Sequence, residues 1–258
     1  MKLKFIEEKA MKVVMLVTTL LVFLFVGSIL YTIVKNGWGA MNWEMISSLP
    51  GGGFYIGKEG GLLNAIVGSL YIVGASTVLG LAVSIPVVFY LNIYLKKNSK
   101  RGSFARLAYD VLFGIPSIVY GAFAFTIMIY LGLKTSLAGG IIVITLLIIP
   151  IFIRSMDEIA RELPQDMLNA SYSLGATRYE TIKVVVRQIA PGIATATLLS
   201  IGRAIGDAAA VLFTAGYTDN IPTSLGQPAA TLPLAVFFQL SSQLYRPFSS
   251  KQMPPRFF

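Results

Sequence analysis

The chain has 258 residues, of which 55% are hydrophobic and only 13% are charged, and its mean hydropathy is +0.72. This composition excludes an ordinary soluble domain and predicts an all-α, polytopic integral membrane protein. The sequence contains no cysteine and no histidine, which excludes disulfides, His or Cys metal sites and histidine acid–base catalysis. The net charge of +9 indicates basic cytoplasmic loops and no nucleic-acid binding, because such loops are typical of polytopic membrane proteins.

The first predicted element is an uncleaved transmembrane helix at Val13–Val34. Its apolar run is long enough to cross about 30 Å of hydrocarbon and exceeds the apolar core of a typical signal peptide. It is preceded by four lysines, Lys2, Lys4, Lys9 and Lys12. The amino terminus is therefore expected in the cytoplasm.

Residues 35–61 are rich in glycine and aromatic residues, which predicts an external loop. Their glycine cluster lacks the Gly-Lys-Ser/Thr ending of a phosphate-binding loop. The apolar run Leu62–Leu95 is too long for one straight span, so we expect a tilted helix or a kink at Pro86. Its many glycines, alanines and serines predict close packing against neighbouring helices.

Two further spans are predicted at Tyr109–Leu131 and Leu137–Ile153. The first contains the string Gly-Ile-Pro-Ser at 114–117, which predicts a break in the helix at membrane depth. Asp110 is expected at the start of this helix, where an acid interacts favourably with the helix dipole.

Lysines and arginines are concentrated before Val13, at 96–108 and at 154–187, whereas the loops between contain only Lys35, Lys58 and Lys134. The positive-inside rule therefore places the three basic segments in the cytoplasm.

The segment 154–187 is predicted to form a helix, a glycine bend and a second helix. Pro164 can open the first helix, and Gly175 can end it in the left-handed conformation. Thr177 and Glu180 have the spacing of a capping box for the second helix. Met167, Leu168, Ser171 and Leu174 recur at helical spacing, so one side of the first helix is expected to be apolar and small. Such a short amphipathic unit between two spans suits a groove on a soluble partner.

The fifth span is predicted at Pro191–Ala215, with Arg203 near its middle and Asp207 one turn later on the same face. An arginine at this depth costs roughly 2.5–3.5 kcal/mol on insertion scales. Two interpretations remain open. The charges either form a neutralised pair that locks two helices together, or Arg203 offers its donors to an oxyanion in transit while Asp207 holds or releases it. Gly202 and Gly206 favour the second interpretation because they leave room for a solute.

After Gly216 the chain is polar and rich in proline, then moderately apolar, and residues 246–258 contain no apolar run. The sequence therefore predicts five transmembrane helices in a single domain over 1–258. Its core is expected at 62–215, with an atypical tail at 246–258.

Two motifs resemble those of ATP-binding-cassette importer permeases. The string NASYSLGA resembles their cytoplasmic EAA-type coupling loop, with matches at Asn169, Ala170, Ser171 and Gly175. The string GRAIGDAAAVLFTAG, which contains Arg203, resembles a span of the phosphate-specific permeases. The resemblance covers 64–240. The family usually has glutamate where this chain has Asn169 and Asp207.

The resemblance implies a type I (MetI-like) importer permease fold, in which the expected sixth helix is missing or altered here, as a frameshift or truncated gene would produce. It implies a subunit that imports inorganic phosphate across the cytoplasmic (inner) membrane of a prokaryote. The implied partners are a related permease, cytoplasmic ATP-binding subunits that dock at 169–175, an extracytoplasmic phosphate-binding protein and membrane lipid. ATP is expected on the ATPase subunits, since this sequence has no Walker motif and needs no cofactor of its own.

Three alternatives remain. The solute could be another oxyanion, such as sulfate, molybdate or phosphonate, because those permeases share the coupling loop. The chain could instead be a non-transporting membrane scaffold or defective paralogue. An integral-membrane enzyme is disfavoured because the only charges expected within the spans are one pair, and no metal-ligand cluster is present in the sequence.

Overall fold

The computed structural model describes residues 2–51, 60–95 and 99–249. The chain divides into two compact units, residues 1–45 and 46–258. The first unit holds α1 (Lys2–Gly37), followed by a 3-10 turn at Trp38–Ala40 and the start of α2 (Trp43–Ser47). Within α1, the segment Ile6–Gly37 is long and apolar enough to cross a membrane, as the sequence predicts.

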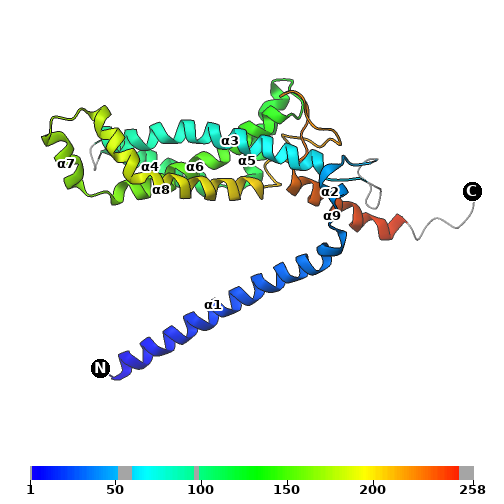
Figure 1. Ribbon diagram of the computed structural model, residues 1–258, viewed down its shortest axis with the longest axis horizontal. Helices are drawn as coiled ribbons and strands as arrows, with labels where there is room; N and C mark the ends of the chain where they lie inside the picture. Colours follow the sequence, from blue (N-terminus) through cyan, green and yellow to red (C-terminus); the bar gives the residue numbers. More distant parts are fainter. Residues whose placement is uncertain (1, 52–59, 96–98, 250–258) are drawn as a thin grey trace, which may run out of the picture. The chain divides into compact units, whose positions relative to one another are not determined.

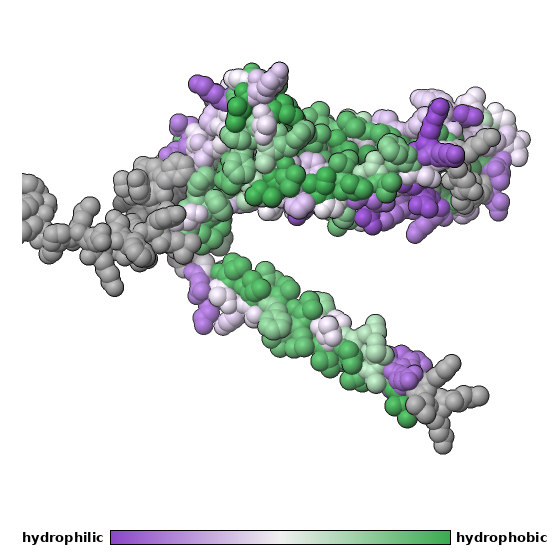
Figure 2. Space-filling view, turned by 180° about the vertical axis from the view of Figure 1, so that it is seen from behind, coloured by the Kyte–Doolittle hydropathy of each residue, from purple (hydrophilic) through white to green (hydrophobic). Residues whose placement is uncertain are grey.

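The second unit is a helical bundle built around three long helices that lie side by side (Figure 1). These are α3 (Leu63–Phe89), α6 (Leu137–Glu162) and α8 (Arg178–Ile205). A π-helical turn, η2 (Tyr90–Tyr94), continues α3. Apolar residues cover the middle of the bundle, and polar residues gather at its α7 end (Figure 2).

Shorter helices complete the second unit. They are α4 (Lys100–Gly114), α5 (Ser117–Tyr130), α7 (Gln165–Ser173) and α9 (Leu232–Ser249). The axes of α4 and α5 differ by 97° across the break at residues 115–116. The break predicted at 114–117 is therefore confirmed. Asp110 is not a helix-start acid, however, because α4 begins at Lys100 with Ser99 as its N-cap.

The core of the bundle is centred on α6, which is closely covered by α3 and α8. Phe152 is fully buried, and a Cβ placed on Gly80 of α3 would lie only 2.9 Å from its ring. Gly192 of α8 similarly faces Ile159 at close range. Small residues thus let the helix backbones approach one another, as the composition of α3 predicts.

The segment 206–231 folds back against the amino end of α6 instead of leaving the bundle. The backbone N–H groups of Ser136 and Leu137 donate to the carbonyls of Thr214 and Gln227 at 2.9 and 2.7 Å. These contacts satisfy donors at the start of α6 that have no partner within the helix. The region after α8 is therefore an ordered part of the fold.

The described residues contain four helices long and apolar enough to span a membrane, and the bent pair α4–α5 can make a fifth. This count agrees with the five predicted spans. The apolar part of α9, Leu232–Ser241, is shorter than the roughly 20 residues that a transmembrane helix needs.

Candidate functional site: the charged pair at the end of α8 and the α7 hairpin

The charged pair predicted from the sequence forms where α8 ends. Arg203 lies in the last turn of α8, and Gly206 caps that helix. The Nη2 atom of Arg203 lies 3.4 Å from Oδ2 of Asp207. The other carboxylate oxygen of Asp207 accepts a hydrogen bond from the N–H of Ala210 at 2.8 Å. Asp207 therefore both pairs with the arginine and fixes the turn that follows the helix.

The predicted end of the fifth span at Ala215 is wrong, because α8 runs without a break through Pro191 and stops at Ile205. The apolar residues that follow, among them Ala210 and Val211, are buried inside the bundle at 0% and 1% exposure. Arg203 consequently lies at the carboxyl end of a helix, where the helix dipole favours a cation, and not near the middle of one.

The two charged side chains differ sharply in exposure. The side chain of Arg203 is 50% exposed, whereas that of Asp207 is only 3% exposed. A guanidinium carries five N–H donors, and the carboxylate of Asp207 approaches it with a single oxygen. A second, solvent-borne acceptor can therefore bind Arg203 without displacing Asp207.

The glycines beside the pair leave space for such an acceptor. A Cβ placed on Gly202 would meet no atom of the described residues within 4 Å. At Gly206 the nearest such atom is a backbone oxygen of the same helix, 3.6 Å away. The geometry fits the interpretation in which Arg203 receives an oxyanion, although the role of the pair stays a prediction.

The four residues of the predicted coupling loop lie on α7 and in the turn after it. Gly175 has a φ of +80°. Its N–H donates to the carbonyl of Tyr172 at 2.9 Å, and the N–H of Ala176 donates to Ser171 at 3.2 Å. These bonds form a Schellman motif, so the predicted helix end at Gly175 is confirmed.

The start of α8 is also as predicted. The hydroxyl of Thr177 accepts from the N–H of Glu180 at 3.3 Å, and the Glu180 carboxylate accepts from the N–H of Thr177 at 2.8 Å. This capping box anchors the amino end of α8. We call α7, the turn at 174–177 and the first turns of α8 the α7 hairpin. Across this hairpin, the hydroxyls of Ser171 and Thr181 lie 3.2 Å apart and join α7 to α8.

The outer face of α7 is open to solvent. Asn169, Ala170 and Gly175 are exposed, and Ser171 is half-buried. Leu174, on the side predicted to be apolar and small, is 89% exposed. The α7 hairpin therefore presents polar and apolar groups that another protein can contact.

Sequence reasoning missed a buried cluster at the α7 end of the bundle, centred on Asp157. The carboxylate of Asp157 is fully buried and accepts hydrogen bonds from Asn92, Arg106 and Tyr109. Two patterns could have revealed it. The helical spacing of apolar residues continues past Ile153, and Arg106 and Tyr109 stand three residues apart on one helix face.

The described residues contain no group of three or more carboxylates that could hold a metal ion.

Comparisons with known proteins all find similarity to membrane components of transport systems. A family model described as "Binding-protein-dependent transport system inner membrane component" matches residues 84–242. The phosphate transport system permease protein PstA of Haemophilus influenzae is 30% identical over 211 residues, covering 81% of this chain and 73% of that protein. PstA of Pasteurella multocida is 32% identical over 211 residues, covering 81% and 74%. PstA 1 of Mycobacterium tuberculosis is 33% identical over 186 residues, covering 71% and 60%.

Proposed function

Because the chain belongs to the family of binding-protein-dependent transport system inner membrane components, we propose that it is the permease subunit of an ATP-driven importer of inorganic phosphate. The names of its relatives support this solute, since several are phosphate transport system permeases at 30–33% identity. The observation that carries the proposal is the half-exposed guanidinium of Arg203 beside the buried carboxylate of Asp207.

In this proposal Arg203 binds a phosphate oxygen during transit. Its planar donors suit phosphate geometry. The nearby carboxylate of Asp207 keeps the guanidinium oriented and lowers the net charge of the site. The phosphate is consequently held without being trapped. Asp207 is buried and fixed by Ala210, so it acts as the stationary partner and Arg203 as the group that exchanges acceptors.

The proposal assigns ATPase docking to the exposed face of α7, with Asn169, Ala170, Ser171 and Gly175 at its centre. The hairpin suits this role because the bend between its two helices is fixed, by the turn at Gly175 and by the capping box at Thr177. ATP is bound by the partner ATPase subunits. A related permease and an extracytoplasmic phosphate-binding protein complete the complex. The basic segments support a cytoplasmic location for α7 and the amino terminus.

The direct test is uptake of radiolabelled phosphate in cells that lack their own phosphate permeases and carry this chain with its partner subunits. We expect Arg203→Gln to lower uptake at least about tenfold, because one charge-assisted contact is lost. Arg187→Gln removes an exposed arginine from the same helix and should leave uptake near that of the unchanged chain. Normal uptake by Arg203→Gln would make the pair structural.

Competition between anions in the same cells tests which anion is transported. Excess unlabelled phosphate should abolish uptake of the label, whereas sulfate, molybdate and phosphonate should not. Inhibition by one of those anions at the same concentration would show that the transporter accepts that anion as well as phosphate. A complex that assembles with its ATPase but moves none of these anions would be a scaffold.

A further inference from the structure

The cluster around Asp157 joins three separate elements through one carboxylate. Arg106 of α4 donates from Nε and Nη2 to the two carboxylate oxygens, at 2.9 and 3.1 Å. The hydroxyl of Tyr109, also on α4, donates at 2.7 Å, and the amide of Asn92 in η2 donates at 2.7 Å. The carboxylate belongs to α6. A buried charge with this number of donors is tightly held, because a displaced donor would leave it unsatisfied.

The π-helical turn η2 helps to place one of these donors. The amide of Asn92 donates to the carbonyl of Val88 at 2.9 Å as well as to Asp157. Its two donor hydrogens are therefore both used, and the orientation of the side chain is fixed. A π-helical turn is a local irregularity that is often found at functional positions in helices.

The cluster lies close to the α7 hairpin along the chain. Asp157 is five residues before Glu162, the last residue of α6, or about 8 Å along the helix axis. Leu163 and Pro164 then lead directly into α7. A force applied to α7 therefore reaches the Asp157 cluster before it reaches the rest of α6.

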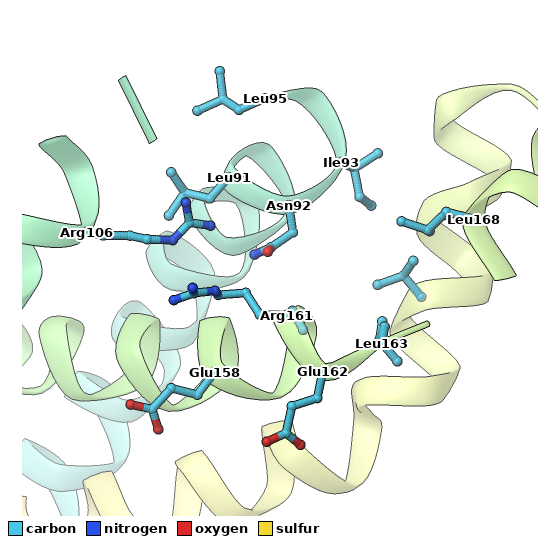
Figure 3. A pocket seen from close by; sticks show the side chains of 12 residues that line it. Leu91, Asn92, Ile93, Leu95, Arg106, Glu158, Arg161, Glu162, Leu163 and Leu168 are labelled. Atoms are coloured by element: carbon cyan, nitrogen blue, oxygen red, sulfur yellow. The ribbon is translucent and has the colours of Figure 1, made fainter. Parts of the chain in front are cut away.

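A cavity separates the cluster from the inner side of α7 (Figure 3). Its volume is about 570 Å³, and Asn92 and Arg106 line it on the cluster side, while Leu163 and Leu168 line it on the hairpin side. The space between the inner side of α7 and the polar cluster is thus partly open. The covalent link from α7 to the cluster is the carboxyl end of α6, and Leu163 and Leu168 also pack against the hydrophobic core of the bundle.

We propose that Asp157 is a positioning residue that clamps α6 to α4 and η2, so that the three move as one body when the ATPase displaces α7. This inference rests on the proposed function, because it assumes that an ATPase moves the hairpin. Without the clamp, displacement of α7 would shift the end of α6 alone. ATP would then be hydrolysed without a corresponding movement of α3 and α4.

The chain offers a matched control on the same two helices. Asp110 of α4 faces Arg154 of α6, with Oδ1 and Nη1 3.7 Å apart, but both side chains are exposed, at 52% and 40%. Exposed ion pairs of this kind contribute little. Asp110→Asn therefore makes the same chemical change as Asp157→Asn, between the same helices, without touching the buried cluster.

The first test measures phosphate transported per ATP hydrolysed by the whole complex in proteoliposomes. We expect Asp157→Asn to lower this ratio about fivefold while ATP hydrolysis continues. Asp110→Asn should leave it unchanged. Tyr109→Phe removes one hydrogen bond without leaving an unpaired buried charge, and it should lower the ratio about twofold. If Asp157→Asn fails to assemble, Tyr109→Phe decides, and a ratio equal to that of the unchanged complex would overturn the inference.

The second test follows the clamp itself. The sequence has no cysteine, so Leu107→Cys on α4 and Glu162→Cys on α6 give two spin labels at exposed positions without removing native thiols. The distance between the labels should be the same in the nucleotide-free and ATP-trapped complex, and it should change between those states only when Asp157→Asn is present. A distance that changes without that substitution would refute the clamp.

The two proposals fail separately in these experiments. If the unchanged complex moves no phosphate, the proposed solute is wrong, yet the label distances still test the clamp because they require only the ATPase cycle. If the complex moves phosphate and Asp157→Asn is fully coupled, the permease function stands and the clamp is wrong.

Discussion

Asp207 combines two roles that substitution can separate. Its Oδ2 faces Arg203 and its Oδ1 caps the N–H of Ala210. We expect Asp207→Asn to keep the cap and lose the charge, whereas Asp207→Ala loses both. Loss of a cap of this type costs about 1 kcal/mol, and the half-exposed ion pair contributes less than that. The alanine variant should therefore melt a few degrees lower than the asparagine variant, as measured by thermal unfolding of the purified complex.

Phosphate uptake by the same two variants distinguishes the charge from the cap. If the carboxylate holds or releases Arg203 during transit, both variants should lose uptake to a similar extent, although only one of them is less stable. Equal melting of the two variants would mean that the Ala210 bond does not stabilise the turn.

At the scale of elements, the glycines of α3 have opposite surroundings. A Cβ on Gly68 would collide with the backbone carbonyl of Ala230, just before α9, whereas a Cβ on Gly74 would meet no atom of the described residues within 4 Å. We expect Gly68→Ala to destabilise the fold by about 1–3 kcal/mol, because a backbone cannot yield as a side chain can. Gly74→Ala should be neutral or slightly stabilising, since alanine favours helix. Thermal unfolding of both variants measures the difference, and equal stability would show that Ala230 is not held closely against α3.

Features that depend on residues close together in the sequence could be predicted, whereas features that depend on distant residues could not. The helix end at Gly175, the capping box at Thr177 and the break at 114–117 were all predictable because each depends on neighbouring residues. The pairing within the Asp157 cluster was not, although helical spacing marks its members separately, since the partners of Asp157 are 48 to 65 residues away in the sequence. The end of α8 was placed wrongly because hydropathy is the same for a segment buried in protein and for one that spans lipid.

For the whole molecule, the distribution of basic residues predicts orientation. The segments 96–108 and 154–187 are basic, and the described residues 99–108 and 154–187 flank the α7 end, whereas the segment 206–231 at the opposite end contains no basic residue. The positive-inside rule then predicts that α7 lies in the cytoplasm and the segment 206–231 outside. The fold is compatible with this arrangement because the two regions lie at opposite ends of α8 (Figure 1).

Cysteine labelling tests this orientation without further engineering, because the chain has no cysteine of its own. Leu174→Cys at the α7 hairpin and Leu225→Cys at the opposite end replace side chains that are 89% and 61% exposed. In intact cells that lack the ATPase subunits, a membrane-impermeant maleimide should label Leu225→Cys and not Leu174→Cys. In inside-out vesicles the pattern should reverse. Labelling of Leu174→Cys from outside intact cells would place the hairpin on the wrong side for an ATPase, and with it the proposed coupling of α7 to ATP hydrolysis would fail.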